Sequence, residues 1–377
     1  MDTSPGPPPI TFLFPGQGSQ YPGMARELYE HQPAFRDRVD ECAGSLEPGL
    51  GTSVRRILLA EPAGEPASVA AQVGADTVQP ALFTLEYALA GLWRSWGLAP
   101  SCVLGHSLGA YAAACTADVL SVADALTLVV ARGRLLGSLP TGAMLAVFLP
   151  EAALETLLPE GLSVAAVNDA TQCVVSGSAS AIAEFEAGLA ERRVESLRLR
   201  VSSPAHSHLL DPVLAEFGAR VREVELRAPT VPWISDTNGE PVSADDARDP
   251  RYWVAHLRRT VRFADALSTA MGGEPKVFLE IGPGDTLITL ARRRRAAAAR
   301  HTLLTSLPGR IEKTTALGRV LGTVDVLKDR GFSLVRERIA RGTASFSLGE
   351  KPAENRRPGV AAMVDLPCTS SDTGENS

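Results

Sequence analysis

The sequence predicts an α/β protein with a parallel sheet covered by helices on both faces, and with a smaller βαββαβ unit inserted into the chain. Three observations support this fold class. Short apolar runs end in glycine loops, helical patterns alternate with these runs, and the order of the elements changes between residues 143 and 202. We therefore expect a large domain made of 1–142 and 203–345, a ferredoxin-like subdomain over 143–202, and a disordered tail over 346–377, where Gly, Pro, Ser and charged residues are frequent.

The apolar spacing indicates each element in turn. Ile10 to Phe14 is a short run of β-formers closed by Pro15-Gly16-Gln17-Gly18, which indicates a buried strand that enters a glycine loop. A second buried strand over 101–104 is followed by a sharp turn at 105–109 and an alanine-rich helix. The other expected strands lie at 144–149, 163–167, 172–176, 194–201, 230–234 and 276–280, and the other expected helices lie after 24 and near 79–96, 122–136, 150–158, 179–193, 212–224, 250–271 and 285–299.

The composition and charge exclude several classes of protein. Of the 377 residues, 45% are apolar and 21% are charged, which is usual for globular proteins and unlike disordered or fibrous chains. The 37 basic and 43 acidic residues give a formal net charge of −6, which argues against a nucleic-acid partner. Because no apolar run reaches the roughly 18 residues of a membrane span, and Met1 to Pro9 carries no basic signal region, we expect a cytoplasmic protein with no membrane partner.

The cysteines do not form a recognisable disulfide or metal pattern. They are odd in number and widely spaced, with no Cys-x-x-Cys pair and no cluster with histidines: Cys42, Cys102, Cys115, Cys173 and Cys368. We expect reduced thiols, no structural metal and no bound cofactor.

The segment Gly105-His106-Ser107-Leu108-Gly109 fits the G-x-S-x-G pattern of a nucleophile elbow. The pattern alone occurs by chance in many chains, but here it lies between an expected strand and an expected helix. In that context the serine hydroxyl is exposed on a sharp turn, and the helix N-terminus and the amide of Leu108 face the oxyanion that develops during attack. The sequence therefore predicts Ser107 as a nucleophile.

A nucleophilic serine needs a general base, and the chain has six histidines. His106 adjoins the serine, and we expect it to pack behind the turn because neighbouring side chains at an elbow point in different directions. His206 lies just after the inserted unit, where the chain returns to the large domain. From the residues alone His206, His208 and His301 all stay candidates for the base.

Seven motifs occur in the order found in one enzyme family: Phe14-Pro-Gly-Gln-Gly-Ser-Gln20, Val78-Gln-Pro-Ala81, Gly105-His-Ser-Leu-Gly109, Ala131-Arg-Gly133, Ser203-Pro-Ala-His-Ser207, Tyr252-Trp-Val-Ala-His-Leu257 and Glu280-Ile-Gly-Pro-Gly284. With them the chain resembles the acyltransferases of polyketide synthases over about residues 10–310, and more distantly the bacterial malonyl-CoA:acyl-carrier-protein transacylase. The resemblance implies an α/β-hydrolase-like large domain with a ferredoxin-like insertion, and a serine–histidine dyad that works by a ping-pong mechanism.

The resemblance also implies roles for particular residues. Ser107 takes the acyl group, and His206 acts first as general base and then as acid toward the leaving thiol. A backbone carbonyl near Ser235 or Asp236 orients the imidazole, and the resemblance does not choose between these two.

The oxyanion hole is expected from the amides of Gln17 and Leu108, and Gln79 matches a glutamine that lines the family's acyl pocket. Each of the glutamines has a plainer interpretation, since Gln17 can cap a glycine turn and Gln79 can begin a helix beside Pro80. Arg132 matches the arginine that pairs with the free carboxylate of malonyl-type groups, although most helical arginines are simply solvated. A guanidinium forms a bidentate pair with a carboxylate, so Arg132 indicates a dicarboxylic acyl-CoA donor.

The size of the acyl group is less sharply indicated. Leu108 resembles the residue of malonyl-selecting members, whereas Ala205 removes the bulk that blocks an α-substituent. Ala110 and Gly137 also replace the larger residues often found there. Malonyl is therefore expected first, and methylmalonyl or another substituted malonyl group is the alternative.

Coenzyme A and an acyl carrier protein are the expected partners, because both present a phosphopantetheine arm. Carrier proteins are acidic, and Arg258-Arg259, Arg292 to Arg295 and Arg300 provide positive charge, although four consecutive arginines also suit a solvated helix end.

The short N-terminal lead and the lack of neighbouring synthase motifs in this sequence suggest a free-standing acyltransferase that acts in trans, with an excised domain as the alternative. An acyl carrier protein is the alternative donor. Two other classes stay open: a serine hydrolase or editing thioesterase, which needs an acid and a late histidine such as Asp285 and His301, and an inactive binding module.

Overall fold

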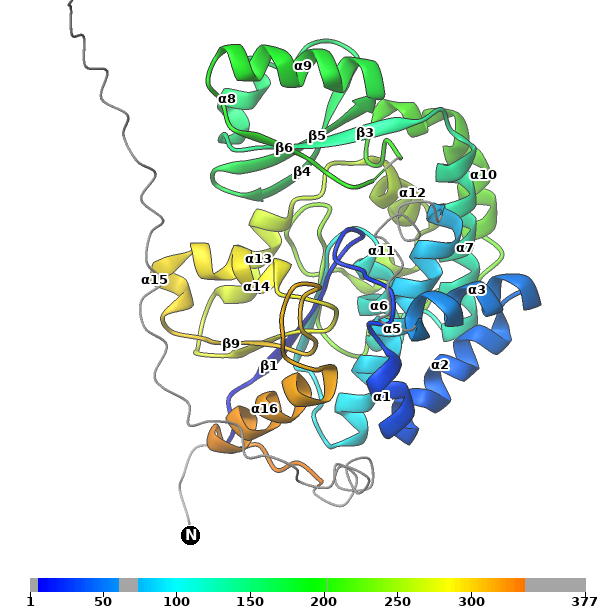
Figure 1. Ribbon diagram of the computed structural model, residues 1–377, viewed down its shortest axis with the longest axis vertical. Coiled ribbons are helices and arrows are strands. Elements are labelled where there is room, and N and C mark those ends of the chain that lie inside the picture. The colour runs from blue at the N-terminus through cyan, green and yellow to red at the C-terminus, as the bar shows by residue number, and fades with distance from the viewer. Residues whose placement is uncertain (1–5, 61–73, 202, 336–377) are drawn as a thin grey trace, which may run out of the picture. The chain divides into compact units, whose positions relative to one another are not determined.

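A computed structural model describes residues 6–60, 74–201 and 203–335 (Figure 1). They belong to one compact unit, and the expected tail over 346–377 lies outside them. Five parallel strands form the larger sheet in the order β7-β2-β1-β8-β9. These strands are β1 (Ile10–Phe14), β2 (Cys102–Gly105), β7 (Trp233–Ile234), β8 (Val277–Glu280) and β9 (Thr302–Thr305).

Helices pack on both faces of this sheet, because alternate side chains of each strand point to opposite faces. Phe12 and Phe14 join the core on one face, and Leu13 joins the core on the other. The core on the first face is shared by α1 (Arg26–His31), α2 (Pro33–Ser45), α3 (Pro48–Leu59), α5 (Ala75–Ser95), α6 (Gly109–Thr116), α7 (Val122–Ser138), α10 (Leu214–Val221), α12 (Pro250–Arg258) and α16 (Ala316–Asp329). The second is covered by α13 (Phe263–Met271), α14 (Thr286–Arg293) and α15 (Arg295–Ala298), drawn in yellow in Figure 1.

The inserted unit forms a second, antiparallel sheet in the order β4-β5-β3-β6. Its elements follow the chain as β3 (Gly142–Val147), α8 (Glu151–Glu155), β4 (Leu162–Asp169), β5 (Gln172–Ser178), α9 (Ala179–Glu191) and β6 (Ser196–Arg198). One face of this sheet, with Leu145 and Val175, packs against α8 and α9. The other face, with Met144 and Val174, joins the core of the large sheet. The expected α/β fold with a βαββαβ insertion is therefore confirmed, and the exact domain boundaries stay a prediction.

The structure differs from the expected elements at several places. Helix α5 begins at Ala75 and contains Pro80 in its second turn, so the proline does not mark the helix start. The expected helix over 250–271 is two helices, α12 and α13. The chain leaves the helix between them because Val261 pairs with Ala166 at the edge strand β4, which covers backbone groups that an edge strand otherwise leaves unpaired. Strand β9 and helix α16 were not expected.

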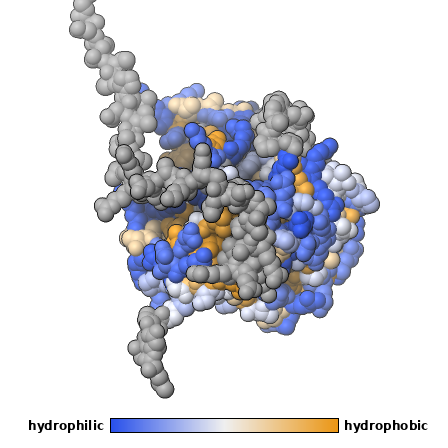
Figure 2. Space-filling view, turned by 60° about the horizontal axis from the view of Figure 1, so that its bottom comes forward, coloured by the Kyte–Doolittle hydropathy of each residue, from blue (hydrophilic) through white to orange (hydrophobic). Residues whose placement is uncertain are grey.

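Two short elements complete the described chain, η1 (His208–Val213) and α11 (Ala244–Arg248). Within the described ranges no helix is long and apolar enough to cross a membrane. On the face drawn in Figure 2, hydrophilic residues cover most of the rim and hydrophobic residues gather toward the middle.

Candidate active site

The carboxyl ends of four parallel strands meet at one edge of the large sheet, where ligand sites of such sheets usually lie. The loop with Gln17 follows β1, and the turn with Ser107 follows β2. Asp236 follows β7, and Glu280 ends β8. Because β2 is hydrogen-bonded to both β1 and β7, the loops after these three strands lie side by side.

Ser107 lies on a strained turn. Its φ of 53° is in the left-handed region, which residues other than glycine rarely adopt and which costs about 1–3 kcal/mol. A Cβ on Gly105 would come 2.2 Å from the amide nitrogen of Ala110, and a Cβ on Gly109 would come 2.1 Å from the carbonyl oxygen of Phe14. Both flanking glycines are therefore required for the sharp turn that exposes the serine hydroxyl.

The structure brings Ser107 and His206 together. The Oγ of Ser107 lies 2.6 Å from Nε2 of His206, and Nδ1 of His206 lies 2.8 Å from the carbonyl oxygen of Arg259. A carbonyl oxygen only accepts, so the neutral ring carries its proton on Nδ1 and leaves Nε2 free to accept the serine proton. This is the tautomer that a general base requires.

The surroundings keep this imidazole neutral. Burial first, and then the positive charge of Arg132, lower the pKa of His206 to about 3. The His206 side chain is 3% exposed. At neutral pH the ring is therefore unprotonated and able to take a proton from Ser107.

The expected carbonyl partner of the imidazole was wrong. Neither Ser235 nor Asp236 orients His206. The carbonyl of Ser235 accepts from the amide of Gly239 at 3.0 Å, and the carbonyl of Asp236 accepts from the amide of Arg262 at 2.6 Å. Arg259 supplies the carbonyl that faces Nδ1 of His206. The break between α12 and α13 explains this, because Arg259 no longer continues the helix and its carbonyl is free to face the ring.

Asp236 has a different place in the site. Its Oδ2 accepts a hydrogen bond of 2.6 Å from the backbone amide of Ser107. Its Oδ1 lies 3.1 Å from Nε2 of His256, at ion-pair distance although not in hydrogen-bond geometry. Burial raises the pKa of Asp236, but His256 and the amide of Ser107 outweigh it and hold that pKa below the usual value. The carboxyl group is therefore a buried anion behind the nucleophile.

Arg132 is a buried cation directly beside the nucleophile. Its side chain is 2% exposed, and Nη2 donates to Oγ of Ser107 at 3.0 Å. Burial lowers the pKa of Arg132, yet a guanidinium stays protonated in proteins. No carboxylate of the described residues pairs with Arg132, and its Nε has no hydrogen-bond partner there. A buried cation left unpaired is costly, which favours an anionic group from a ligand at this place.

A cavity of about 290 Å³ contains these groups. The large domain contributes Gln17, Gln79, Leu108 and Ala205, and the small sheet contributes an apolar wall that includes Met144. Nε2 of Gln79 is 3.4 Å from Oε1 of Gln17, so these two side chains are neighbours. The backbone amides of Gln17 and Leu108 donate to no described residue and are free to bind an oxyanion.

His106 also lines the cavity, with Nε2 2.8 Å from Oδ1 of Asn168, and so is not packed behind the turn.

The competing residues lie elsewhere. Nδ1 of His208 is 3.3 Å from the Oγ of Ser163. His301 binds the amide of Lys276 and the carbonyl of Met271, and Asp285 pairs with Arg292. None of these candidates lines the cavity around Ser107, so the structure does not assemble the acid and late histidine of a serine hydrolase from them.

Three groups of the site were not predicted from the sequence: Asp236 as a partner of the serine, His256 behind it and the carbonyl of Arg259.

The arginine run over 292–295 is largely structural. Arg293 pairs with Asp169 at 2.9 Å, and Arg294 donates to Oγ of Ser268.

Four of the cysteines are free thiols, and Cys368 lies outside the described residues.

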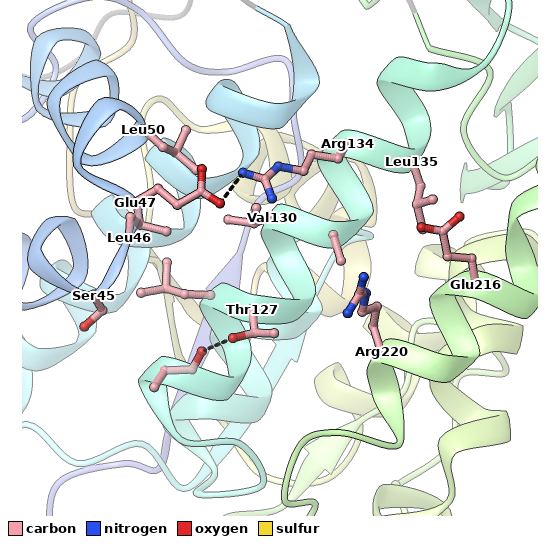
Figure 3. Close-up of a pocket in the computed structure, with 13 residues that line it drawn as sticks. Ser45, Leu46, Glu47, Leu50, Thr127, Val130, Arg134, Leu135, Glu216 and Arg220 are labelled. Carbon is pink, nitrogen blue, oxygen red and sulfur yellow. Dashed lines mark hydrogen bonds and ion pairs between the residues drawn. The ribbon is translucent and has the colours of Figure 1, made fainter.

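A second cavity, of about 350 Å³, lies on another face of α7 (Figure 3). Arg134 extends toward it and pairs with Glu47 at 2.8 Å. None of the residues around Ser107 lines this second cavity.

Comparison with known proteins adds family information to this geometry. The family model described as "Acyl transferase domain" matches residues 11–326. The chain is 39% identical over 319 residues to the spectinabilin polyketide synthase system protein NorB of Streptomyces orinoci, with 82% of this chain and 15% of that protein covered. It is 40% identical over 277 residues to the phenolphthiocerol synthesis polyketide synthase Pks15/1 of Mycobacterium marinum, with 73% of this chain and 13% of that protein covered. The chain thus spans only a small part of the length of these relatives.

Solved structures agree. The acyl transferase domain of SpnD in complex with 2-(pent-4-yn-1-yl)malonyl matches with a TM-score of 0.79 and 38% identity, over 89% of this chain and 78% of that one. FabD from Acinetobacter baumannii matches with a TM-score of 0.72 and 27% identity, over 86% of this chain and 99% of that one.

Proposed function

The chain belongs to the acyl transferase domain family, and from that premise we propose that it transfers a malonyl-type acyl group from coenzyme A to the phosphopantetheine thiol of an acyl carrier protein in polyketide biosynthesis. One observation carries the choice of acyl group. Arg132 is buried, has no carboxylate partner among the described residues and donates to the Oγ of Ser107 at 3.0 Å. A free carboxylate on the acyl group forms an ion pair with the guanidinium of Arg132 and fixes the thioester carbonyl near the nucleophile.

The first half-reaction forms an acyl-serine. His206 takes the proton of Ser107 on Nε2 while the serine oxygen attacks the thioester carbonyl. The amides of Gln17 and Leu108 donate to the resulting oxyanion. When the tetrahedral intermediate collapses, the carbon–sulfur bond breaks and His206 returns the proton to the leaving thiolate of coenzyme A.

The second half-reaction is the same chemistry in reverse. The phosphopantetheine thiol of the carrier protein gives its proton to His206 and attacks the acyl-serine, and Ser107 leaves with that proton. Since the same dyad serves both halves, the kinetics are ping-pong. The apolar wall of the small sheet, including Met144 and Val174, limits the access of water to the acyl-serine.

The size of the acyl group is set by the side chains around the dyad. Leu108 is buried beside the nucleophile, and a branched residue at this place resembles the malonyl-selecting members of the family, which favours malonyl. Ala205 lines the cavity with a single methyl group and leaves room for a small α-substituent. We therefore place malonyl first and methylmalonyl second.

Intact mass measurement after incubation with competing acyl-CoAs tests the proposal. We expect the wild-type protein to gain one malonyl group, and Ser107→Ala to gain none while it stays folded. We expect Arg132→Ala to lose malonyl loading and to favour acetyl-CoA relative to wild type. Arg134→Ala is the matched control, since Arg134 lies on the same helix but faces the second cavity. Acetyl loading as fast as malonyl loading in the wild-type protein would contradict the role of Arg132.

The acceptor and the mode of action need a second measurement. We expect a carrier protein supplied on a separate chain to discharge the acyl-serine much faster than water does. Water discharging it first would favour the hydrolase or editing thioesterase, and loading from an acyl carrier protein alone would change the donor. The trans-acting arrangement stays a prediction that this transfer tests.

A further inference from the structure

A buried carboxylate lies on the backbone side of the nucleophile and has no part in the reaction steps above. Oδ2 of Asp236 accepts the amide hydrogen of Ser107 at 2.6 Å. Asp236 is 1% exposed, and its backbone carbonyl accepts from the amide of Arg262 at 2.6 Å, so hydrogen bonds hold both the side chain and the backbone of this residue.

The sheet explains why these two residues meet. Strands β2 and β7 run parallel, with Leu104 opposite Ile234. Asp236 lies two residues after Ile234, and Ser107 lies three residues after Leu104. Because parallel strands end at the same edge, the side chain of Asp236 reaches the first turn after β2.

Ser107 needs such a partner because its conformation is unfavourable. Its φ of 53° lies in the left-handed region, and the acceptor of its amide hydrogen is the carboxylate of Asp236. An amide buried without an acceptor costs about 1–3 kcal/mol, so loss of the carboxylate would destabilise this one conformation relative to others. The hydroxyl would then lose its alignment with His206.

A second group holds the carboxylate in turn. Nε2 of His256 lies 3.1 Å from Oδ1 of Asp236. The His256 ring is itself enclosed by aromatic rings, with centroids 5.8 Å away at Tyr111, 6.3 Å away at Trp253 and 6.4 Å away at Tyr252. A packed aromatic shell of this kind restricts the rotamers of the side chain that it surrounds.

We infer that Asp236 is a positioning residue, which accepts the amide hydrogen of Ser107 and holds the serine hydroxyl in line with His206, an inference that rests on the proposed role of Ser107 as nucleophile. Asp236 does not line the cavity around Ser107. It also removes the amide of Ser107 from the donors available to the oxyanion, which leaves that task to the amides of Gln17 and Leu108.

The isosteric variant separates this role from a purely electrostatic one. In Asp236→Asn the carbonyl oxygen still accepts from the amide of Ser107. The new NH₂ group faces Nε2 of His256, which accepts in the tautomer with its proton on Nδ1. Asp236→Ala removes the acceptor altogether. Asp211→Asn is the matched control, because Asp211 is an exposed carboxylate that pairs with Arg258 outside the cavity.

The experiment measures labelling of Ser107 by an uncharged fluorophosphonate, together with kcat and KM for malonyl-CoA. We expect Asp236→Ala to slow labelling and to lower kcat by about 100-fold, with KM changed less than about threefold, because alignment and not binding is lost. We expect Asp236→Asn to stay within about tenfold of wild type. Asp211→Asn should match wild type.

Labelling of Asp236→Ala at the wild-type rate overturns the inference, and so does labelling of Asp236→Asn that is as slow as that of Asp236→Ala. If circular dichroism shows that Asp236→Ala does not fold, Asp236→Asn decides alone: a rate within about tenfold of wild type supports the inference and a slower rate overturns it. A wild-type protein that reacts with the probe but takes no malonyl group contradicts the proposed function only, and the probe rates still decide on Asp236.

Discussion

The charge of Arg132 should set the pH at which His206 stops acting as a base. Burial and Arg132 are the two largest causes of the low pKa of His206, which lies at about 3 instead of 6.5. Replacing Arg132 by Gln keeps a polar side chain of moderate size but removes the positive charge. The imidazolium form then becomes less unfavourable, so the pKa of His206 rises. The acid limb of any reaction that needs the neutral ring must move to higher pH.

The size of this shift follows from the geometry. Nη2 of Arg132 and Nε2 of His206 both contact Oγ of Ser107, at 3.0 Å and 2.6 Å. These two nitrogens are therefore no more than about 5.6 Å apart, and two unit charges at that separation repel by about 3 kcal/mol at an effective dielectric constant of about 20. Because one pKa unit corresponds to about 1.4 kcal/mol, Arg132→Gln should raise the pKa of His206 by about two units, to about 5.

The assay is the rate at which an uncharged sulfonyl fluoride inactivates Ser107, measured from about pH 4 to pH 8. An uncharged probe avoids the carboxylate contact that Arg132 is proposed to make. We expect a nearly flat profile for wild type and a rate for Arg132→Gln that halves near pH 5. Arg134→Gln, which loses the same charge from the same helix, should keep the wild-type profile. A wild-type rate that titrates near pH 6.5, or a profile that Arg132→Gln leaves unmoved, would refute the reasoning.

Three other changes have defined outcomes. His206→Ala should slow single-turnover acylation by at least about 10³-fold, whereas His208→Ala should stay within about threefold, and equal losses would mean that the base is another residue. Ala205→Phe should reduce methylmalonyl loading relative to malonyl loading by about tenfold in a competition measured by intact mass, and an equal fall for both would contradict the size argument. Burial raises the pKa of Glu280 to about 8, so the folded protein retains a proton that the unfolded chain loses above about pH 4.5, and stability falls as the pH rises toward 8. Glu280→Gln should remove a stability loss on the order of a few kcal/mol between about pH 5 and pH 8, as measured by chemical denaturation at both values, and identical pH dependence in the two proteins would refute this assignment.

Local chemistry explains why much of the fold could be predicted from the sequence. The turn at Ser107 needs glycine at 105 and 109, because a Cβ at either place would meet backbone atoms within 2.2 Å. Such a requirement leaves a pattern in adjacent residues. The inserted sheet is likewise visible in alternation, since Leu145 and Val147 face α9 while Met144 faces the large domain.

The residues that could not be predicted are those fixed by contacts between distant segments. The partner of His206 is a backbone carbonyl, that of Arg259, and any residue type provides a carbonyl. The direction of this carbonyl depends on where α12 ends, because the chain beyond the helix continues to Val261, which pairs with β4 of the other sheet. The contact of Asp236 with Ser107 spans 129 positions in the chain and follows from strand order, which a single sequence does not show.

The same charge that makes Arg132 selective for a carboxylate should also link substrate choice to catalysis. In the free protein its positive charge lowers the pKa of His206. When a malonyl carboxylate pairs with the guanidinium, that charge is largely neutralised, and the pKa of His206 rises in the complex. The base therefore becomes stronger only with a donor that carries the carboxylate. Because kcat reports the complex and kcat/KM reports the free protein, the acid limb of kcat for malonyl-CoA should lie about one to two pH units above that of kcat/KM. With acetyl-CoA the two limbs should coincide. Coincident limbs for malonyl-CoA as well would show that the carboxylate does not reach Arg132.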